Sequence, residues 1–161
     1  MRCKRCRGAA VIEVRRHNAA FCRDCFFHYV GQQVTRAIAK HRMLEPADRV
    51  LVAVSGGKDS LALWDLLLEL GYHADGLYLS LGIGAYSERS KGICEEFAAA
   101  RGATLVATDL AAEHGYTIPE AAGAGGRSSC GVCGLSKRYV FNKAARDGDK
   151  VEVRFAISGG G

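Results

Sequence analysis

The sequence predicts an α/β domain built on a parallel sheet, with a small metal-binding knuckle in front of it. Three observations carry this prediction. Apolar, β-branched runs alternate with segments whose apolar residues recur at helical spacing, over residues 49–108. A glycine turn, SGGKDS at residues 55–60, joins the first such run to the first helical segment. Two C-x-x-C pairs precede both features.

The elements are expected in a simple order along the chain. A helix at 28–44 ends before Pro46. The α/β part follows, with strand 49–55, helix 59–70, strand 76–81, helix 87–101 and strand 104–108. The remainder is expected to be a loop at 111–129, a basic helix at 134–146, a fourth strand at Val151–Ile157 and a flexible end. The predicted domains are a knuckle at 1–27, a linking helix at 28–48 and the α/β domain at 49–161.

Charge is distributed unevenly along the 161 residues, whose formal net charge is +5. Residues 1–50 hold 11 Lys or Arg and 4 Asp or Glu, a net +7; residues 51–161 hold 11 and 13, a net −2. A basic N-terminal segment could attract a polyanion such as nucleic acid, or it could be an ordinary solvated surface. No apolar run approaches the ~20 residues of a membrane span. No signal peptide is evident, so we expect a cytoplasmic protein without a membrane partner.

The turn at residues 55–60 is the strongest functional signal. A glycine turn between a strand and a helix surrounds an anion with backbone N–H groups and the positive end of the helix dipole. Gly56 and Gly57 would let the backbone approach phosphate oxygens without a Cβ in the way. The turn therefore predicts a site for a phosphate chain, and a plain tight turn is the alternative.

The side chains of the turn fit the same chemistry. Ser55 and Ser60 supply hydroxyl donors, and Lys58 supplies a mobile positive charge. Asp59 is expected either to cap the helix or to hold Mg²⁺. Gly82 follows the second strand, and ligands of parallel sheets bind beyond the carboxyl ends of the strands. We therefore include Gly82 in the predicted nucleotide site.

Four of the seven cysteines have the spacing of a structural Zn²⁺ site. Cys3 and Cys6 form one pair, Cys22 and Cys25 form the other, and fifteen residues separate the pairs. Each pair can place two sulfurs on a tetrahedron, and the intervening residues are expected to form a hairpin.

The other three cysteines are less specific. Cys130 and Cys133 could be half of a second metal site, a redox dithiol or part of an iron–sulfur site, and the residues alone leave these three alternatives open. Cys94 lies in an expected helix, where a cysteine is usually a small buried hydrophobic residue.

Four motifs in this order resemble one protein family. They are the cysteine knuckle followed by HRML, then SGGKDS, LGIGAYSERS and CGVCGLSKRY. Together they resemble the TtcA/TtuA family of PP-loop tRNA 2-thiolation enzymes, most of all its TtuA branch, the tRNA-5-methyluridine 2-sulfurtransferases. The resemblance implies a PP-loop ATP pyrophosphatase fold of the adenine nucleotide alpha hydrolase type. It also implies that ATP adenylates the C2 oxygen of a uridine, and that sulfur then displaces AMP.

The resemblance implies roles for specific residues. The zinc ligands would be Cys3, Cys6, Cys22 and Cys25. The ATP loop would be Ser55, Gly56, Gly57, Lys58, Asp59 and Ser60. Two of the three cysteines of a [4Fe–4S] cluster would be Cys130 and Cys133, with Lys137 and Arg138 beside them. We assign catalytic roles to Asp59, Lys137, Cys130 and Cys133; an exposed helix face is the alternative for Lys137 and Arg138.

The resemblance also implies partners: a tRNA, and a ubiquitin-like sulfur-carrier protein that ends in a thiocarboxylate; relatives further suggest a homodimer. Family members continue into a G-H-N-x-D-D-E motif, with the third cluster cysteine beyond it, where this sequence reads FAISGGG at 155–161. The alternative expectation is therefore a truncated module that binds nucleotide, zinc and tRNA without turnover. A PP-loop enzyme acting on a small molecule is disfavoured by the knuckle and the basic N-terminus.

Overall fold

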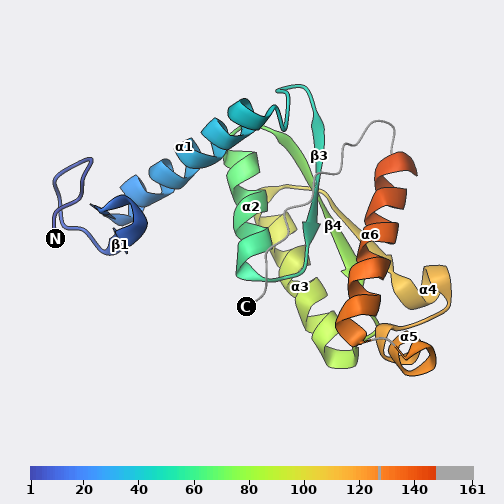
Figure 1. Cartoon of the computed structure of the whole chain (residues 1–161). Helices are drawn as coiled ribbons and strands as arrows, with labels where there is room; N and C mark the ends of the chain where they lie inside the picture. The colour runs from blue at the N-terminus through green and yellow to red at the C-terminus, as the bar shows by residue number, and fades with distance from the viewer. Residues whose placement is uncertain (127, 148–161) are drawn as a thin grey trace. The chain divides into compact units, whose positions relative to one another are not determined.

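The computed structural model describes residues 1–126 and 128–147. They belong to two compact units, one spanning Met1–Glu45 and one that begins at Pro46 (Figure 1). Each unit is described by itself below. Among the described residues, no helix is both long enough and apolar enough to cross a membrane.

The first unit is a β-hairpin followed by a helix. Strands β1 (Ile12–Val14) and β2 (Ala19–Phe21) pair antiparallel around the short helix η1 (Arg15–His17), which confirms the expected hairpin. Helix α1 (Arg23–His41) begins earlier than the predicted residue 28, because Cys22 is extended and serves as its N-cap. It ends before the predicted residue 44, because Arg42 adopts the left-handed conformation at the C-cap.

The second unit contains a three-stranded sheet of order β3-β4-β5, and its strands are parallel, as predicted. Its strands are β3 (Arg49–Val54), β4 (His73–Ser80) and β5 (Leu105–Asp109), connected by helices α2 (Lys58–Glu69) and α3 (Gly84–Arg101). The register places Val54 beside Tyr78 and Ser80 beside Asp109. The carboxyl ends of the three strands therefore share one edge of the sheet, where α/β proteins bind ligands.

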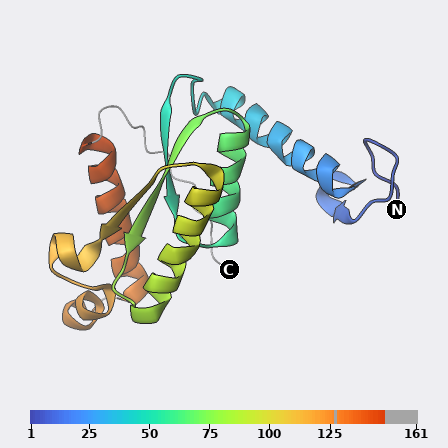
Figure 2. The same ribbon diagram turned by 180° about the vertical axis from the view of Figure 1, so that it is seen from behind.

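Helices α2 and α3 cover one face of this sheet (Figures 1 and 2). Trp64 of α2 is fully buried there, and its indole Nε1–H donates to the carbonyl of Ala74 at 2.9 Å. Its six-membered ring lies against β4 at Gly76, where a Cβ would be 2.5 Å from the nearest indole carbon. The Gly76 site therefore lets the largest core side chain pack directly on the backbone of the central strand.

Three helices pack on the other face of the sheet: α4 (Leu110–His114), α5 (Ile118–Gly125) and α6 (Ser129–Asp147). The core on this face joins the central strand to these helices and consists of Leu77, Leu79, Leu81, Leu110, Ile118, Val140 and Phe141. It is contiguous and apolar, so the position of α6 is fixed by side chains of β4.

Two predictions for this region are wrong. Residues 111–129 are mostly helical rather than a loop, because Asp109 caps α4 and Thr117 forms a capping box with Glu120 at the start of α5. The last described helix begins at Ser129 rather than 134, so Cys130 and Cys133 lie on its first turns. The predicted strand at Val151–Ile157 and the predicted flexible end lie outside the described residues.

Gly76→Ala is expected to destabilise the second unit by about 1–3 kcal/mol, because the new methyl group must displace the Trp64 ring from a packed core. Urea unfolding followed by tryptophan fluorescence measures this. Gly92→Ala is the matched control: this glycine lies inside α3, and a Cβ there meets nothing within 4 Å. The control should be neutral or stabilising by about 0.5–1 kcal/mol. Equal stability of the two variants would contradict the packing described here.

Candidate functional site

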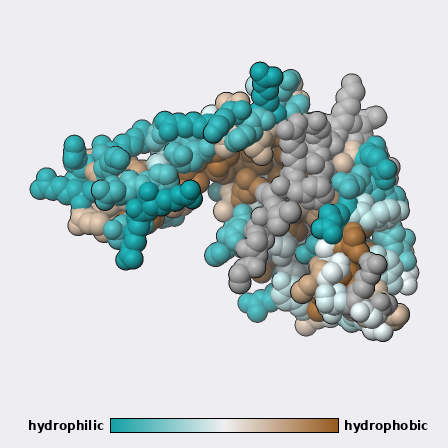
Figure 3. All heavy atoms as spheres, viewed as in Figure 1, coloured by the Kyte–Doolittle hydropathy of each residue, from teal (hydrophilic) through white to brown (hydrophobic). Residues whose placement is uncertain are grey.

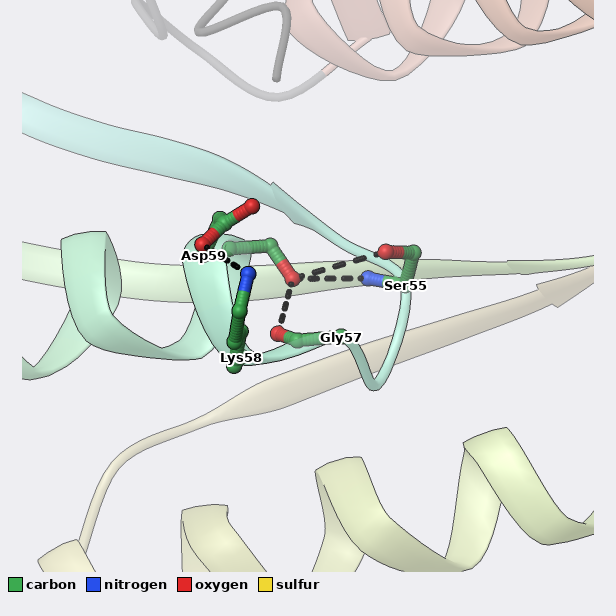
Figure 4. Close-up of polar contacts among 5 residues, drawn as sticks. Ser55, Gly57, Lys58 and Asp59 are labelled. Atoms are coloured by element: carbon green, nitrogen blue, oxygen red, sulfur yellow. Dashed lines mark hydrogen bonds and ion pairs between the residues drawn. The ribbon is translucent and has the colours of Figure 1, made fainter. Parts of the chain in front are cut away.

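The glycine turn lies between the carboxyl end of β3 and the first turn of α2, and its own hydrogen bonds hold it in shape (Figure 4). The hydroxyl of Ser60 accepts from the backbone N–H of Ser55 at 3.2 Å and donates to the carbonyl of Gly57 at 3.0 Å. The hydroxyls of Ser55 and Ser60 are 3.5 Å apart. Ser60 is therefore engaged within the loop, and Ser55 is the better placed hydroxyl for a ligand.

The start of α2 offers backbone N–H groups rather than a side-chain cap. Its N-cap is Gly57, which makes no side-chain cap hydrogen bond, and the helix is 12 residues long. The first-turn amides of such a helix lack intrahelical acceptors, and the helix dipole adds a partial positive charge. This combination favours binding of an anion.

Lys58 and Asp59 pair with each other at the mouth of the loop (Figure 4). The Lys58 ammonium lies 3.0 Å from an Asp59 carboxylate oxygen, and the two side chains are 89% and 63% exposed. Asp59 does not cap the helix, so one of the two roles expected for it is not seen here. An exposed ion pair of this kind contributes little stability and is easily exchanged for other partners.

Gly82 joins two elements at the same edge of the sheet. Its φ is +69°, and the side chain of Thr117 occupies the space that a Cβ at Gly82 would need. Just before it, the carbonyl of Leu81 accepts from the N–H of Ile118 at 3.1 Å. The contact seen for Gly82 is thus packing against the start of α5, and its predicted nucleotide contact stays a prediction.

The four N-terminal cysteines converge on one point. Their sulfur atoms all lie within 4.8 Å of one another, and those of Cys6 and Cys22 are 3.7 Å apart. Cys22 and Cys25 bracket the start of α1, while Cys3 and Cys6 lie in the turn before the hairpin, where the N–H of Cys3 donates to Gly8 at 2.8 Å. Together they form a metal-binding cluster of four thiols.

The pKa values of two of these thiols shift in opposite directions. Backbone N–H groups, those of Cys6 first, lower the pKa of Cys3 to about 6. The neighbouring Cys22 thiol, together with burial, raises the pKa of Cys25 to about 12. Four thiolates in one place repel each other unless a cation neutralises them. Metal binding would therefore release protons from this cluster.

Cys130 and Cys133 lie on the first turns of α6, at the edge of the sheet where β3 and β4 end (Figures 1 and 2). Ser128 caps this helix, and its hydroxyl accepts from the N–H of Gly131 at 3.2 Å. Cys130 is exposed, whereas Cys133 is half-buried against the core. Half-buried Lys137 follows Cys133 at i+4, so the three side chains form one stripe along the helix.

Arg138 lies next to Lys137 in sequence and is exposed. Its guanidinium is 3.8 Å from the position that a Cβ on Gly134 would take. Within the described residues, the N-terminal cluster is the one group of three or more His, Cys, Asp or Glu side chains that could share a metal ion. Cys130 and Cys133 therefore offer two ligands from this part of the chain.

Sequence reasoning missed a polar network at the start of α3. The Tyr78 hydroxyl bonds to Ser87 and Ser90, both of which are buried. Two serines three residues apart in a helix next to the glycine segment, in the motif LGIGAYSERS, were the available signal. Cys94 is fully buried, as predicted.

Comparisons with known proteins support the predicted resemblance. A family model described as "2-thiouridine synthetase TtuA, N-terminal LIM domain" matches residues 2–27, which include all four clustered cysteines. The tRNA-5-methyluridine(54) 2-sulfurtransferase of Thermus thermophilus is 50% identical over 145 residues, covering 90% of this chain and 45% of that protein. The protein of the same name from Pyrococcus horikoshii is 37% identical, covering 91% and 47%.

Over the matched region the chain is similar to members of the TtcA/TtuA family. The predicted resemblance is thereby confirmed. A solved structure supports the fold: the U34-tRNA thiolase NcsA from Methanococcus maripaludis with its [4Fe–4S] cluster superimposes on this chain with a TM-score of 0.79. It is 20% identical, and the match covers 93% of this chain and 51% of that one. The PP-loop α/β fold is confirmed as well. The chain spans about half the length of the curated relatives it matches.

Cys22→Ser is expected to remove most of the metal bound by the N-terminal cluster, because one of four converging thiols is lost. Elemental analysis of the purified protein would measure the bound metal that is stable to gel filtration. Cys94→Ser, which changes a cysteine distant from the cluster in sequence, is the control and should leave this metal content unchanged. An unchanged metal content in Cys22→Ser would contradict the assignment of the cluster.

Proposed function

We propose that this chain is the ATP-activating part of a tRNA 2-sulfurtransferase whose target is the 5-methyluridine of the T-loop. The observation that carries the proposal is the SGGKDS loop at the β3–α2 junction. It occurs in a chain 50% identical to a tRNA-5-methyluridine(54) 2-sulfurtransferase. In the proposed reaction the uridine C2 oxygen attacks the α-phosphorus of ATP and pyrophosphate leaves. Sulfur then attacks C2, and AMP leaves with the oxygen.

The loop supplies binding and orientation for the first step. The first-turn amides of α2 and the Ser55 hydroxyl would hold the β- and γ-phosphates, and Lys58 would neutralise them. In-line attack at the α-phosphorus requires a fixed pyrophosphate leaving group. Positioning and charge neutralisation are the main contributions a protein makes to phosphoryl chemistry.

Asp59 is the proposed Mg²⁺ ligand. Its carboxylate is exposed and held by Lys58, so both side chains can change partners at little cost. Carboxylate oxygen is the ligand type that Mg²⁺ takes from proteins, usually beside phosphate oxygens. A bound Mg²⁺ would neutralise charge on the phosphates, while Asp59 itself orients the ion and Lys58 turns to the nucleotide.

The stripe on α6 is the proposed sulfur side of the site. Cys130 and Cys133 fit two ligand positions of an iron–sulfur cluster, which when bound would deliver sulfide. Lys137 lies one turn beyond Cys133 on the same face, where its ammonium could hold the phosphate of the adenylated uridine. The common edge of the sheet supports the pairing of this stripe with the loop (Figure 1).

Zn²⁺ is the proposed metal of the N-terminal cluster. Four thiolates around Zn²⁺, each about 2.3 Å from the ion, lie about 3.8 Å from one another in a tetrahedron. The 3.7 Å between the sulfurs of Cys6 and Cys22 fits that geometry. The buried core of this unit is small (Cys3, Ala19, Phe21 and Cys25), so the bound metal would supply much of its folding free energy.

The first unit is the proposed tRNA-binding surface. Residues 1–45 hold 10 Lys or Arg against 3 Asp or Glu, a net +7. The face of this unit seen in Figure 3 is largely hydrophilic. Phe27 is 60% exposed, and the Arg23 guanidinium lies 5.9 Å from its ring centroid. Basic side chains beside an exposed aromatic ring suit a backbone of phosphates with an unstacked base.

The remaining parts of the proposal concern partners. The sulfur donor would be a ubiquitin-like carrier protein that ends in a thiocarboxylate. The protein would act in the cytoplasm, and it would assemble as a homodimer. A relative named cytoplasmic tRNA 2-thiolation protein 1, from Aspergillus niger, is 28% identical over 98% of this chain and supports the location. A module that binds nucleotide, metal and tRNA without turnover is the competing function, because the described part of the chain offers two cluster thiols.

The full chain, reconstituted anaerobically with iron and sulfide, should form 2-thiouridine in unmodified tRNA when ATP, Mg²⁺ and a sulfur donor are added. Mass spectrometry of digested tRNA measures the product. The double variant Ser55→Ala/Lys58→Ala should lose both the product and ATP binding, because it loses a hydroxyl donor and the loop's cation. ATP binding without product in the unmodified chain would favour the binding module. ATP binding that survives in the double variant would contradict the loop assignment.

Arg36→Ala in α1 is expected to weaken tRNA binding about threefold and to lower the salt slope, d log K/d log[salt], by about 1 in magnitude. Arg36 is exposed in the basic unit. Arg49→Ala is the matched control, since that arginine is exposed in the second unit and paired with Asp75 at 3.3 Å. Filter binding at several salt concentrations measures both. Equal effects of the two variants would argue against a tRNA surface on the first unit.

A further inference from the structure

The glycine turn rests directly on the backbone of α3. Gly56 has a φ of +72°, and a Cβ added there would lie 2.7 Å from the Ser90 carbonyl oxygen and 3.0 Å from the Ser90 Cα. No side chain fits between loop and helix at this point. A small shift of α3 at Ser90 would therefore be transmitted to the loop as a shift of its backbone.

Ser90 is itself held in place by the central strand. The hydroxyl of buried Tyr78 donates to the carbonyl of Ser87 at 2.7 Å and lies 2.8 Å from the Ser90 hydroxyl. The Ser90 hydroxyl also lies 2.9 Å from the carbonyl of Tyr86, to which it can donate. Burial raises the pKa of the Tyr78 hydroxyl, so it stays protonated and remains a donor at neutral pH.

Cys94 lies one helical turn beyond Ser90 on α3. Its side chain is fully buried. Burial raises the pKa of its thiol, and the backbone N–H of Gly56, which faces the sulfur, acts in the opposite direction. The thiol is therefore neutral, and it provides an acceptor on the helix side of the loop.

We propose that Tyr78, Ser90 and Cys94 are positioning residues for ATP: they fix the backbone of Gly56 and thereby the direction of the loop amides that receive the phosphates. The inference rests on the proposed ATP function of the loop. The hydrogen bonds of Ser60 hold the internal shape of the loop, and the contact of Gly56 with Ser90 fixes the loop against α3. The loop amides are thereby preorganised before nucleotide arrives.

Tyr78→Phe tests the inference without touching the loop. It removes one hydroxyl and leaves the buried ring in place, and MgATP affinity should fall about fivefold to tenfold. Tyr116→Phe is the matched control, because the Tyr116 hydroxyl also contacts one serine, Ser136 at 2.9 Å, on the other face of the sheet. Calorimetric titration with MgATP gives both affinities, and thermal unfolding gives both stabilities. The control should bind MgATP as the unmodified chain does.

Substitutions of Cys94 provide a second test, in which the MgATP affinity and the melting temperature are expected to change independently. Cys94→Ala loses the acceptor that faces Gly56 and should weaken MgATP binding by up to about tenfold. Cys94→Ser restores an acceptor and should recover most of the affinity, although a buried hydroxyl lowers the melting temperature.

Each outcome of these titrations has a distinct meaning. Weakened binding in Tyr78→Phe and Cys94→Ala, with Tyr116→Phe and Cys94→Ser close to the unmodified chain, supports the inference. Unmodified protein that binds MgATP while Tyr78→Phe and Cys94→Ala bind equally well overturns the inference and leaves the proposed function intact. Affinity that follows the melting temperature across all four variants also overturns it. Unmodified protein that fails to bind MgATP overturns the proposed function together with the inference.

Discussion

The central strand β4 is buried on both faces, and each face holds one part of the candidate site. Gly76 receives the Trp64 ring and Tyr78 bonds to α3 on one side. On the other side, Leu77 and Leu79 pack in the core that carries α6. Adjacent residues of a strand point to opposite faces of the sheet. The eight-residue strand β4 therefore positions both the part of α3 that contacts the glycine turn and the helix α6 that carries the cysteine stripe. A shift of register by one residue would exchange the two faces and misplace both.

The two units of the chain depend on different interactions for their folding stability. The second unit buries large apolar side chains on both faces of its sheet, so its stability comes from apolar burial and close packing. The buried hydrophobic cluster around the knuckle of the first unit consists of two cysteines, one alanine and one phenylalanine. Four thiolates brought together here would repel each other without a cation. The metal proposed for this cluster would therefore be the organising contact of the first unit, as the packed Trp64 ring is in the second.

The sequence allowed prediction of those features whose physical cause is local. Val50, Val52 and Val54 form a β-branched run that only a buried strand accommodates well, and the glycine turn follows it at once. The paired cysteines specify a shared point in space by their spacing alone. Residues 111–129 were predicted to be a loop with a glycine cluster at 123, 125 and 126, although the T-x-x-E capping box that starts α5 is a local helix signal. The segment thus contains both a loop signal, the glycines, and a helix signal, the capping box, and the helix forms.

The contacts that were not predicted are those between segments distant in sequence. Nothing near Gly56 in the sequence indicates that Ser90 lies against it, because that contact depends on how α3 crosses the sheet. The same holds for Gly82, whose glycine was interpreted as a ligand contact and is packed against Thr117. A glycine with positive φ is compatible with a ligand, a turn or a close neighbour, and only the three-dimensional arrangement distinguishes these.

The Lys58–Asp59 pair gives the proposed nucleotide site a preference that neither residue would give alone. In the absence of ligand, each charge satisfies the other at 3.0 Å. A bare phosphate would attract Lys58 but leave Asp59 facing an anion, so part of the gain is lost to repulsion. A nucleotide that arrives with Mg²⁺ offers an anion to Lys58 and a cation to Asp59 together. The exchange of partners is then favourable on both sides. In the proposed site, these adjacent opposite charges would therefore select the metal-bound nucleotide over free phosphate, at the position where the loop amides beside α3 would receive it.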